Sequence, residues 1–188
     1  MFSQLNHLDR SATSADGSMS YSLEMKMKNS PEVKTILYTT DLGGQTRPVF
    51  RHALAMAKLY DAKIIMMHVV EPMGETAKAI ISAYLSQEFT EDMQKDTMKE
   101  ILAKMKDRLR KFYEDECEEE KVCSNVKELI VVSGKPSEEI LRVSEEEKAD
   151  MIIVGKSTRK VRGIRVMGST ARRVSRMAGI PVLVVPNY

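Results

Sequence analysis

The sequence predicts an α/β protein, a single doubly wound, Rossmann-like domain in which helices cover both faces of a five-stranded parallel sheet. Three observations lead to this prediction. Five short runs of mainly β-branched and aliphatic residues recur along the chain, at 33–40, 63–70, 126–132, 151–154 and 181–185. The runs are almost continuously apolar, which is typical of strands buried on both faces. Helical patterns separate successive runs, and right-handed crossovers then make the strands parallel.

The connections between these strands carry apolar residues at helical spacing. One stripe covers residues 49–60, and a longer one covers residues 98–112, before the third strand. Pro136 is suited to the first turn of a third helix. The stripe of the last helix includes Ala171 and Val174, and Gly179 ends that helix before the final strand.

The chain has 188 residues, which suits one domain with a substantial core. Residues 1–30 show no apolar period, so we expect a flexible N-terminal arm or extension, with the folded domain at 31–188. No run approaches the ~18 apolar residues of a membrane helix, and the N-terminus lacks the apolar block of a signal peptide. We therefore expect a cytoplasmic protein without a membrane partner.

Cysteine and histidine usage predicts no protein-bound metal site. The two cysteines, Cys117 and Cys123, are expected to be free thiols in a reducing compartment. The three histidines are scattered and complete no zinc-ligand spacing. His68 lies inside an apolar run and is interpreted as a hydrogen-bonded core residue, and the acidic run at 114–120 as a solvated helix end.

Charge is distributed unevenly along the chain. The net charge is +2, but residues 151–188 contain eight Lys or Arg and no Asp or Glu, while the remainder has 21 basic and 27 acidic residues. The last quarter of the chain is therefore expected to attract anions where its side chains and backbone N–H groups converge.

Polar residues follow the first strand at Thr40 and Asp41. Ligands of doubly wound proteins bind beyond the carboxyl ends of the strands, where a carboxylate can accept hydrogen bonds from a ribose or a base. Asp is also an ordinary turn former, so both interpretations of Asp41 stay open. The following LGGQTRP lacks the G-x-G-x-x-G fingerprint of an NAD site.

A glycine-containing loop follows the fourth strand and reads GKSTRKVRGIRVMGST from Gly155 to Thr170. It is not a P-loop, because that motif needs glycine at position 150, where the chain has Asp150. Gly168 and Ser169 stand at the start of the last helix, where free N–H groups and hydroxyls favour an anion. The alternative is that Ser169 only caps the helix.

At these positions the chain resembles the universal stress protein family, which has an adenine-nucleotide alpha hydrolase-like fold. Nucleotide-binding members carry a G-x2-G-x9-G-[ST] loop between the fourth strand and the last helix. Gly155, Gly168 and Ser169 match this spacing, whereas the second glycine falls on Thr158. The resemblance extends over about residues 33–186, including HVVEP at 68–72 and PVLVVP at 181–186.

The resemblance implies a site for ATP, with Mg bridging the phosphates. It places Thr40, Asp41 and Val70 near the adenosine. It also places a second set of residues near the phosphates: Gly155, Thr158, Gly168, Ser169 and Thr170. If the family's second glycine requires a positive φ, the β-branched Thr158 is penalised there.

The function expected from these features is that of a dimeric stress-response module that binds ATP or a related adenine nucleotide and has no catalysis of its own. The stretch from Pro181 to Pro186 follows the last crossover, so it should form an exposed sheet edge that pairs with a second copy, as the resemblance also implies. The alternative is a dimeric interaction protein of this fold that binds no nucleotide. A hydrolase would need a carboxylate near the phosphates, and residues 151–188 offer none. The basic loop has no aromatic residue to stack nucleic-acid bases.

Overall fold

The computed structural model describes residues 31–43, 45–72, 74, 79, 87–120, 125–157, 160–161 and 164–187, with backbone only at 87–94, 118–120, 160–161 and 164–165. Residues Glu32–Tyr188 form one compact unit. Among the described helices, none combines the length and apolar character that a membrane crossing requires.

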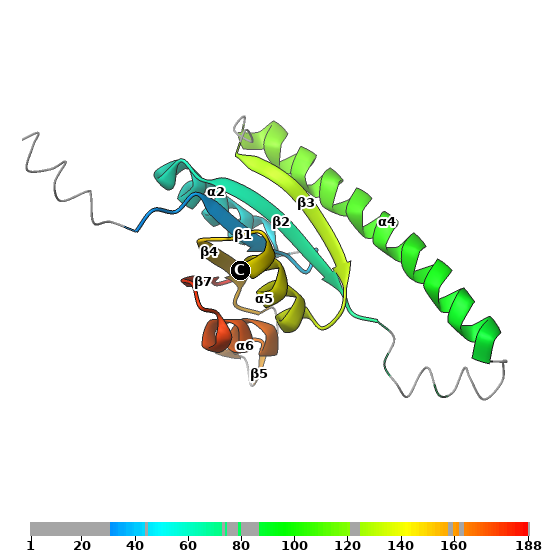
Figure 1. Ribbon diagram of the computed structural model, residues 1–188. Helices are drawn as coiled ribbons and strands as arrows, with labels where there is room; N and C mark the ends of the chain where they lie inside the picture. Colours follow the sequence, from blue (N-terminus) through cyan, green and yellow to red (C-terminus); the bar gives the residue numbers. More distant parts are fainter. Residues whose placement is uncertain are drawn as a thin grey trace, which may run out of the picture. The chain divides into compact units, whose positions relative to one another are not determined.

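The centre of the fold is a parallel sheet of five strands in the order β3-β2-β1-β4-β7 (Figure 1). The strands are β1 (Thr35–Thr39), β2 (Lys63–Val70), β3 (Val126–Ser133), β4 (Met151–Gly155) and β7 (Val182–Val185). The predicted fold class is thus confirmed, and the final strand lies at a sheet edge as expected. After β3 the chain crosses to the other side of β1, so the topological switch lies between β1 and β4, where Thr39 is level with Val154.

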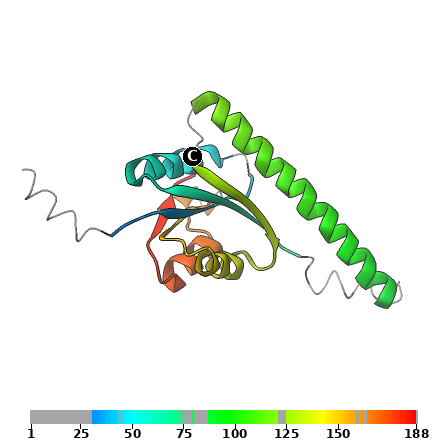
Figure 2. The ribbon, with the colours of Figure 1, turned by 45° about the horizontal axis from the view of Figure 1, so that its top comes forward.

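In the described part of the chain, α-helices cover both faces of the sheet (Figure 2). They are α2 (Arg47–Tyr60), α4 (Gln87–Glu120), α5 (Pro136–Glu146) and α6 (Ser169–Met177). Alternate residues of each strand enter separate cores: Ile36 and Tyr38 pack with α2 and α4, whereas Leu37 packs with α5 and α6. This double coverage explains the continuous apolar runs of the strands.

A short antiparallel hairpin, β5 (Lys160–Val161) with β6 (Ile164–Arg165), interrupts the connection between β4 and α6. This hairpin was not predicted from the sequence. Strands of two residues in a basic loop have no apolar alternation that a pattern search can detect.

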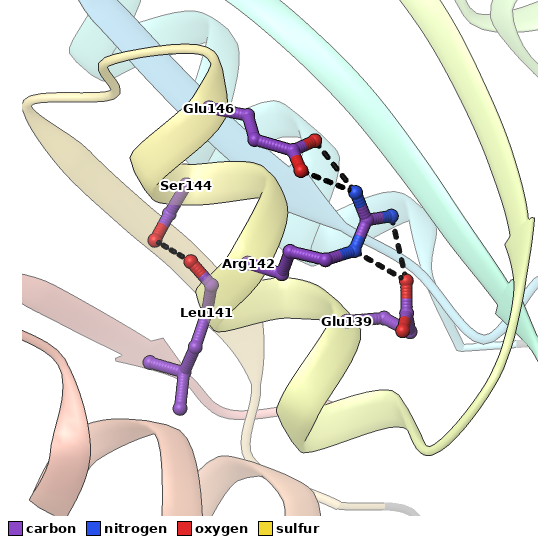
Figure 3. Close-up of polar contacts among 5 residues, drawn as sticks. All are labelled: Glu139, Leu141, Arg142, Ser144 and Glu146. Carbon is purple, nitrogen blue, oxygen red and sulfur yellow. Dashed lines mark hydrogen bonds and ion pairs between the residues drawn. The ribbon is translucent and has the colours of Figure 1, made fainter.

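Polar contacts along α5 stabilise the helix whose N-terminal half carries Pro136 and Ile140, which line a cavity at the carboxyl edge of the sheet. The Arg142 guanidinium donates to Glu139 at 2.7 Å and to Glu146 at 2.6 Å (Figure 3). These carboxylates raise the pKa of Arg142, with the hydrogen bond to Glu139 as the largest cause. Such i,i+3 and i,i+4 pairs favour the helical conformation.

Two expectations about the end of α4 are wrong. Cys117 is disulfide-bonded, not a free thiol; Cys123 lies outside the described residues. The expectation rested on a reducing compartment, but residue spacing in the sequence shows neither the redox conditions nor whether two cysteine Cα atoms lie within the roughly 7 Å that a disulfide requires. Glu116 belongs to the run predicted to be solvated, yet it is fully buried, 3.0 Å from Arg47 and 3.4 Å from Arg51 of α2.

Tyr38 should make the stability of the fold sensitive to alkaline pH. The side chain is fully buried beside Phe50, with ring centroids 5.3 Å apart, and burial raises the pKa of its hydroxyl above the ordinary value of 10.0. Above pH 10.0 the unfolded chain therefore loses the phenolic proton while the folded chain keeps it, so stability falls as pH rises.

Tyr38→Phe is expected to flatten this part of the stability profile. Urea unfolding between pH 9 and 11.5 should show a smaller decline for the variant than for the parent, roughly as linkage requires for one titrating group. Parallel declines for the two proteins would contradict the assignment.

Candidate functional site

A cavity of about 490 Å³ opens at the carboxyl ends of β1, β2 and β4, at the topological switch. Its wall is built from the β1–α2 connection, the end of β2, the first turn of α5, the segment after β4, the start of α6 and Asn187. Ligand pockets typically have about 300–1,000 Å³. The cavity is therefore large enough for a nucleotide-sized molecule.

Six of the eight site residues expected from sequence line this cavity: Thr40, Asp41, Gly155, Gly168, Ser169 and Thr170. Thr158 lies outside the described residues. Val70 is not among the lining residues, and its neighbour Val69 lines the cavity instead. Consecutive strand residues point to opposite faces, and Val69 is the one on the α5 face.

The β1–α2 loop, residues 40–43 and 45–46, is held by local hydrogen bonds. Thr40 Oγ1 accepts the N–H of Leu42 at 3.0 Å, and Asp41 Oδ1 accepts the N–H of Gly43 at 2.9 Å. Leu42 adopts a left-handed φ of 53°. Asp41 thus forms the turn that its residue type favours, and it is also an exposed carboxylate on the cavity wall. The interpretation of Asp41 as a turn former is confirmed, and its contact with a ligand stays a prediction.

His68 lies beside this loop and lines the cavity, half-buried rather than in the core. Its Nδ1 is 2.8 Å from the carbonyl oxygen of Thr40. A carbonyl oxygen only accepts, so Nδ1 carries a proton, and Nε2 is an acceptor when the ring is neutral. The interpretation of His68 as hydrogen-bonded is confirmed, but its position on the cavity wall was missed.

Asn187 is a cavity residue that the sequence analysis did not identify. It is 5% exposed, accepts the N–H of Ser157 through Oδ1 at 3.2 Å, and donates through Nδ2 to the Gln45 carbonyl at 3.4 Å. It thereby joins the segment after β4 to the β1–α2 loop. A Cβ on Gly155 would lie 2.8 Å from this amide, which explains the glycine. The available signal was a polar residue two positions after the last strand, at the edge where ligands bind.

The start of α6 presents backbone N–H groups to the cavity. Gly168 is the N-cap residue, with φ −64° and ψ 157°, and no side chain caps the helix, so Ser169 is not the cap. The first N–H groups of a helix lack intrahelical acceptors. Ser169, Thr170 and Ala171 line the cavity at this helix end, which favours an anion.

The cavity wall is chemically divided. Asp41, His68 and Glu71 lie on the β1 and β2 side, whereas Lys156 and the start of α6 lie on the β4 side. One side can accept hydrogen bonds from hydroxyl or amino groups, and the other can hold negative charge. Within the part of the chain that the structure describes, no group of three His, Cys, Asp or Glu side chains could hold a metal ion.

The fold and this cavity define a doubly wound α/β protein with a polar cavity at its switch point. The model of the universal stress protein family matches residues 32–186, and the chain belongs to this family.

Individual relatives are similar over most of their length. The chain is 30% identical over 160 residues to universal stress protein MJ0577 of Methanocaldococcus jannaschii, covering 81% of this chain and 94% of that protein. It is 27% identical to a universal stress protein of Thermus aquaticus, covering 81% and 98%. Among solved structures, that of MJ0577 has a TM-score of 0.58 at 27% identity over 84% and 98% of the two chains. UspA of Lactobacillus plantarum has a TM-score of 0.64 at 18% identity over 83% and 99%, which supports the fold.

Proposed function

We propose that this universal stress protein binds an adenine nucleotide, ATP with its phosphates bridged by Mg²⁺, in the cavity at the switch point. The observation that carries the proposal is the division of the cavity wall, with the Asp41 carboxylate on one side and the uncapped start of α6 on the other. A nucleotide has this same division, because hydroxyl and amino groups stand at one end and an anion at the other.

The residues would then have distinct roles. Thr40, Asp41 and Val69, which takes the place expected of Val70, would contact the adenosine. The phosphates would lie against the second set: Gly155, Thr158, Gly168, Ser169 and Thr170. A Cβ on Gly155 would collide with the Asn187 amide, and one on Gly168 would press on Lys156 and Ser157, so both glycines allow the close packing of the backbone on this side of the cavity. The Mg²⁺ would be held by phosphate oxygens, with Lys156 adding positive charge to that side.

The adenosine side is tested with Asp41→Asn. Asn retains an oxygen for the turn with Gly43 but removes the charge, so one charge-assisted hydrogen bond to a ribose hydroxyl weakens. Such bonds contribute about 1.5–3 kcal/mol, which predicts a roughly 10-fold or greater rise in the Kd for Mg-ATP. Calorimetry should show no comparable change for inorganic triphosphate, which lacks the adenosine.

Asp107→Asn is the matched control, because Asp107 is an exposed α4 carboxylate paired with Arg110 at 3.1 Å. It should bind Mg-ATP like the parent. An unchanged Kd in Asp41→Asn, or an equal loss for inorganic triphosphate, would argue against a ribose contact at Asp41.

We also propose that the protein is a homodimer that pairs through β7, in the stretch from Pro181 to Pro186. The strand β7 lies at the sheet edge and is paired with β4 on one side. Pro181 and Val185 direct their carbonyl groups to β4, and backbone groups of alternate residues point to opposite sides of a strand. The backbone groups of Val182 and Val184 therefore point away from β4, toward the position of a second copy.

Val184→Pro is expected to abolish this dimer without breaking the β4–β7 ladder, because proline removes an outward N–H and is tolerated on edge strands. Light scattering at micromolar concentration should give twice the chain mass for the parent and for Val184→Ala, and the single chain mass for Val184→Pro. A parent that scatters as a single chain would contradict the proposal.

A further inference from the structure

The contact of Glu116 with α2 links α4 to the ligand cavity. The side chain is fully buried, with Oε1 3.0 Å from Nε of Arg47 and Oε2 3.4 Å from Nε of Arg51, while both arginine side chains are about half exposed, at 50% and 47%. The two arginines are four residues apart, so they stand on one face of the first turns of α2. One carboxylate of α4 therefore holds the start of α2.

The start of α2 continues directly from the cavity wall. Arg47 is the first residue of α2 and follows Thr46, which is 4% exposed and lines the cavity. Thr46 Oγ1 in turn donates to the carbonyl of Gly43, within the same loop. Fixing Arg47 therefore also restrains the end of the β1–α2 loop.

A second contact from α4 reaches the other end of this loop. Arg108 Nη2 donates to the carbonyl oxygen of Leu42 at 3.5 Å. Leu42 has the left-handed φ of 53° and directly follows Asp41. Non-glycine residues adopt this conformation infrequently, so an external donor helps to hold the backbone there. The two α4 contacts thus bracket the loop at Leu42 and at Arg47.

A buried ion pair is weak evidence for added stability, because well-packed apolar residues often serve as well. A role in geometry is the alternative for Glu116, because a charged contact can favour one arrangement of the elements that it joins. Apolar packing between α2 and α4 is already provided nearby by Phe50 and Phe112, whose ring centroids are 5.5 Å apart.

We infer that Glu116 and Arg108 of α4 are positioning residues that hold the β1–α2 loop, and with it Asp41, in the ligand-binding arrangement. The inference rests on the proposed nucleotide site for its effect on affinity. Coupling between two positions is reciprocal, so a ligand in the cavity also stabilises the contact of α4 with α2. The packing of α4 against α2 then depends on whether the cavity is occupied.

Three variants test the effect on affinity by calorimetry with Mg-ATP. Glu116→Gln should raise the Kd roughly 10-fold, within the 5- to 150-fold span typical of coupled sites. Arg108→Ala removes a surface contact and should raise the Kd several-fold while the protein stays folded. Asp107→Asn, adjacent to Arg108 but paired with Arg110 on α4 itself, should leave the Kd unchanged.

A combined variant separates positioning from a general loss of stability. If Glu116 acts through Asp41, the rise in Kd caused by Glu116→Gln should largely disappear in the Asp41→Asn background, since coupled residues are not additive. The loss of stability in urea unfolding should remain in both backgrounds. Fully additive effects on Kd would overturn the inference.

Hydrogen exchange of the ligand-free protein separates this inference from the proposed function. Glu116→Gln and Arg108→Ala should each speed exchange of the Leu42 and Gly43 amides, which are hydrogen-bonded to Thr40 and Asp41, and Asp107→Asn should not. Faster exchange with no nucleotide binding by the parent would sustain the positioning role and refute the nucleotide site. The positioning role would be overturned if amide exchange were unchanged in both variants, or if both variants bound Mg-ATP with the Kd of the parent. If Glu116→Gln does not fold, the exchange and the Kd of Arg108→Ala alone decide the outcome.

Discussion

Gly168→Val is expected to abolish nucleotide binding in a chain that remains folded. A Cβ at this position would lie 3.3 Å from the carbonyl oxygen of Lys156 and 3.4 Å from Cβ of Ser157, and valine adds two further methyl groups. The N–H of Gly168 donates to the same Lys156 carbonyl at 2.8 Å. The branched side chain must therefore separate the start of α6 from the segment after β4.

The size of the effect follows from the groups that are displaced. If two backbone N–H groups at the start of α6 lose their hydrogen bonds to phosphate, at about 1.5–3 kcal/mol each, the Kd rises roughly 100-fold or more. Calorimetry with Mg-ATP should then show no saturation in the range where the parent saturates. Gly168→Ala, with one methyl group, should give an intermediate Kd.

Gly179→Val is the matched control, because Gly179 lies at the other end of α6. Gly179 follows α6, and a Cβ there would meet nothing within 4 Å. This variant should bind like the parent, with the same circular dichroism. Equal binding by Gly168→Val and Gly179→Val would exclude the start of α6 as the phosphate position.

Phe50→Ala is expected to cause the largest loss of stability. Phe50 is fully buried in the core shared by β1, α2 and α4, with ring centroids 5.3 Å from Tyr38 and 5.5 Å from Phe112. Truncation removes the contacts of Phe50 with Tyr38 and Phe112 and leaves a cavity. Such a change typically lowers the free energy of unfolding by about 3–5 kcal/mol. Domains are stable by about 5–15 kcal/mol, so the variant should unfold at much lower urea concentration.

Leu59→Ala on the same helix provides the comparison, because Leu59 is 69% exposed. Its free energy of unfolding should lie within about 0.5 kcal/mol of the parent. Similar losses for the two variants would mean that the core is not organised around Phe50.

The strands could be predicted to within about two residues because both faces of the sheet are covered, so each strand is a continuous apolar run. The same property hid a detail of the site. When both faces are apolar, the sequence does not reveal which of two adjacent residues points to the cavity, and Val70 was expected where Val69 stands. Which of the two side chains points to the cavity depends on α5, because α5 packs on the face of the sheet to which Val69 belongs.

The residues that sequence reasoning missed depend on distant partners. Glu116 looks like any member of an acidic helix end, and its burial depends on arginines of α2, with Arg51 65 residues away. Asn187 acquires its role from Gln45, 142 residues away. Neither spacing forms a local pattern, whereas Asp41, Gly155 and Gly168 could be predicted because they occupy the ends of strands and the start of a helix.

The most direct test of the nucleotide site is a calorimetric titration of the parent chain with Mg-ATP up to millimolar concentration, beside Thr158→Gly, which restores the glycine of the family loop. We expect saturable binding at one site per chain, and binding by Thr158→Gly that is at least as tight. The absence of saturable heat in both proteins would contradict it, because neither the divided cavity wall nor the restored glycine would then suffice to hold the nucleotide.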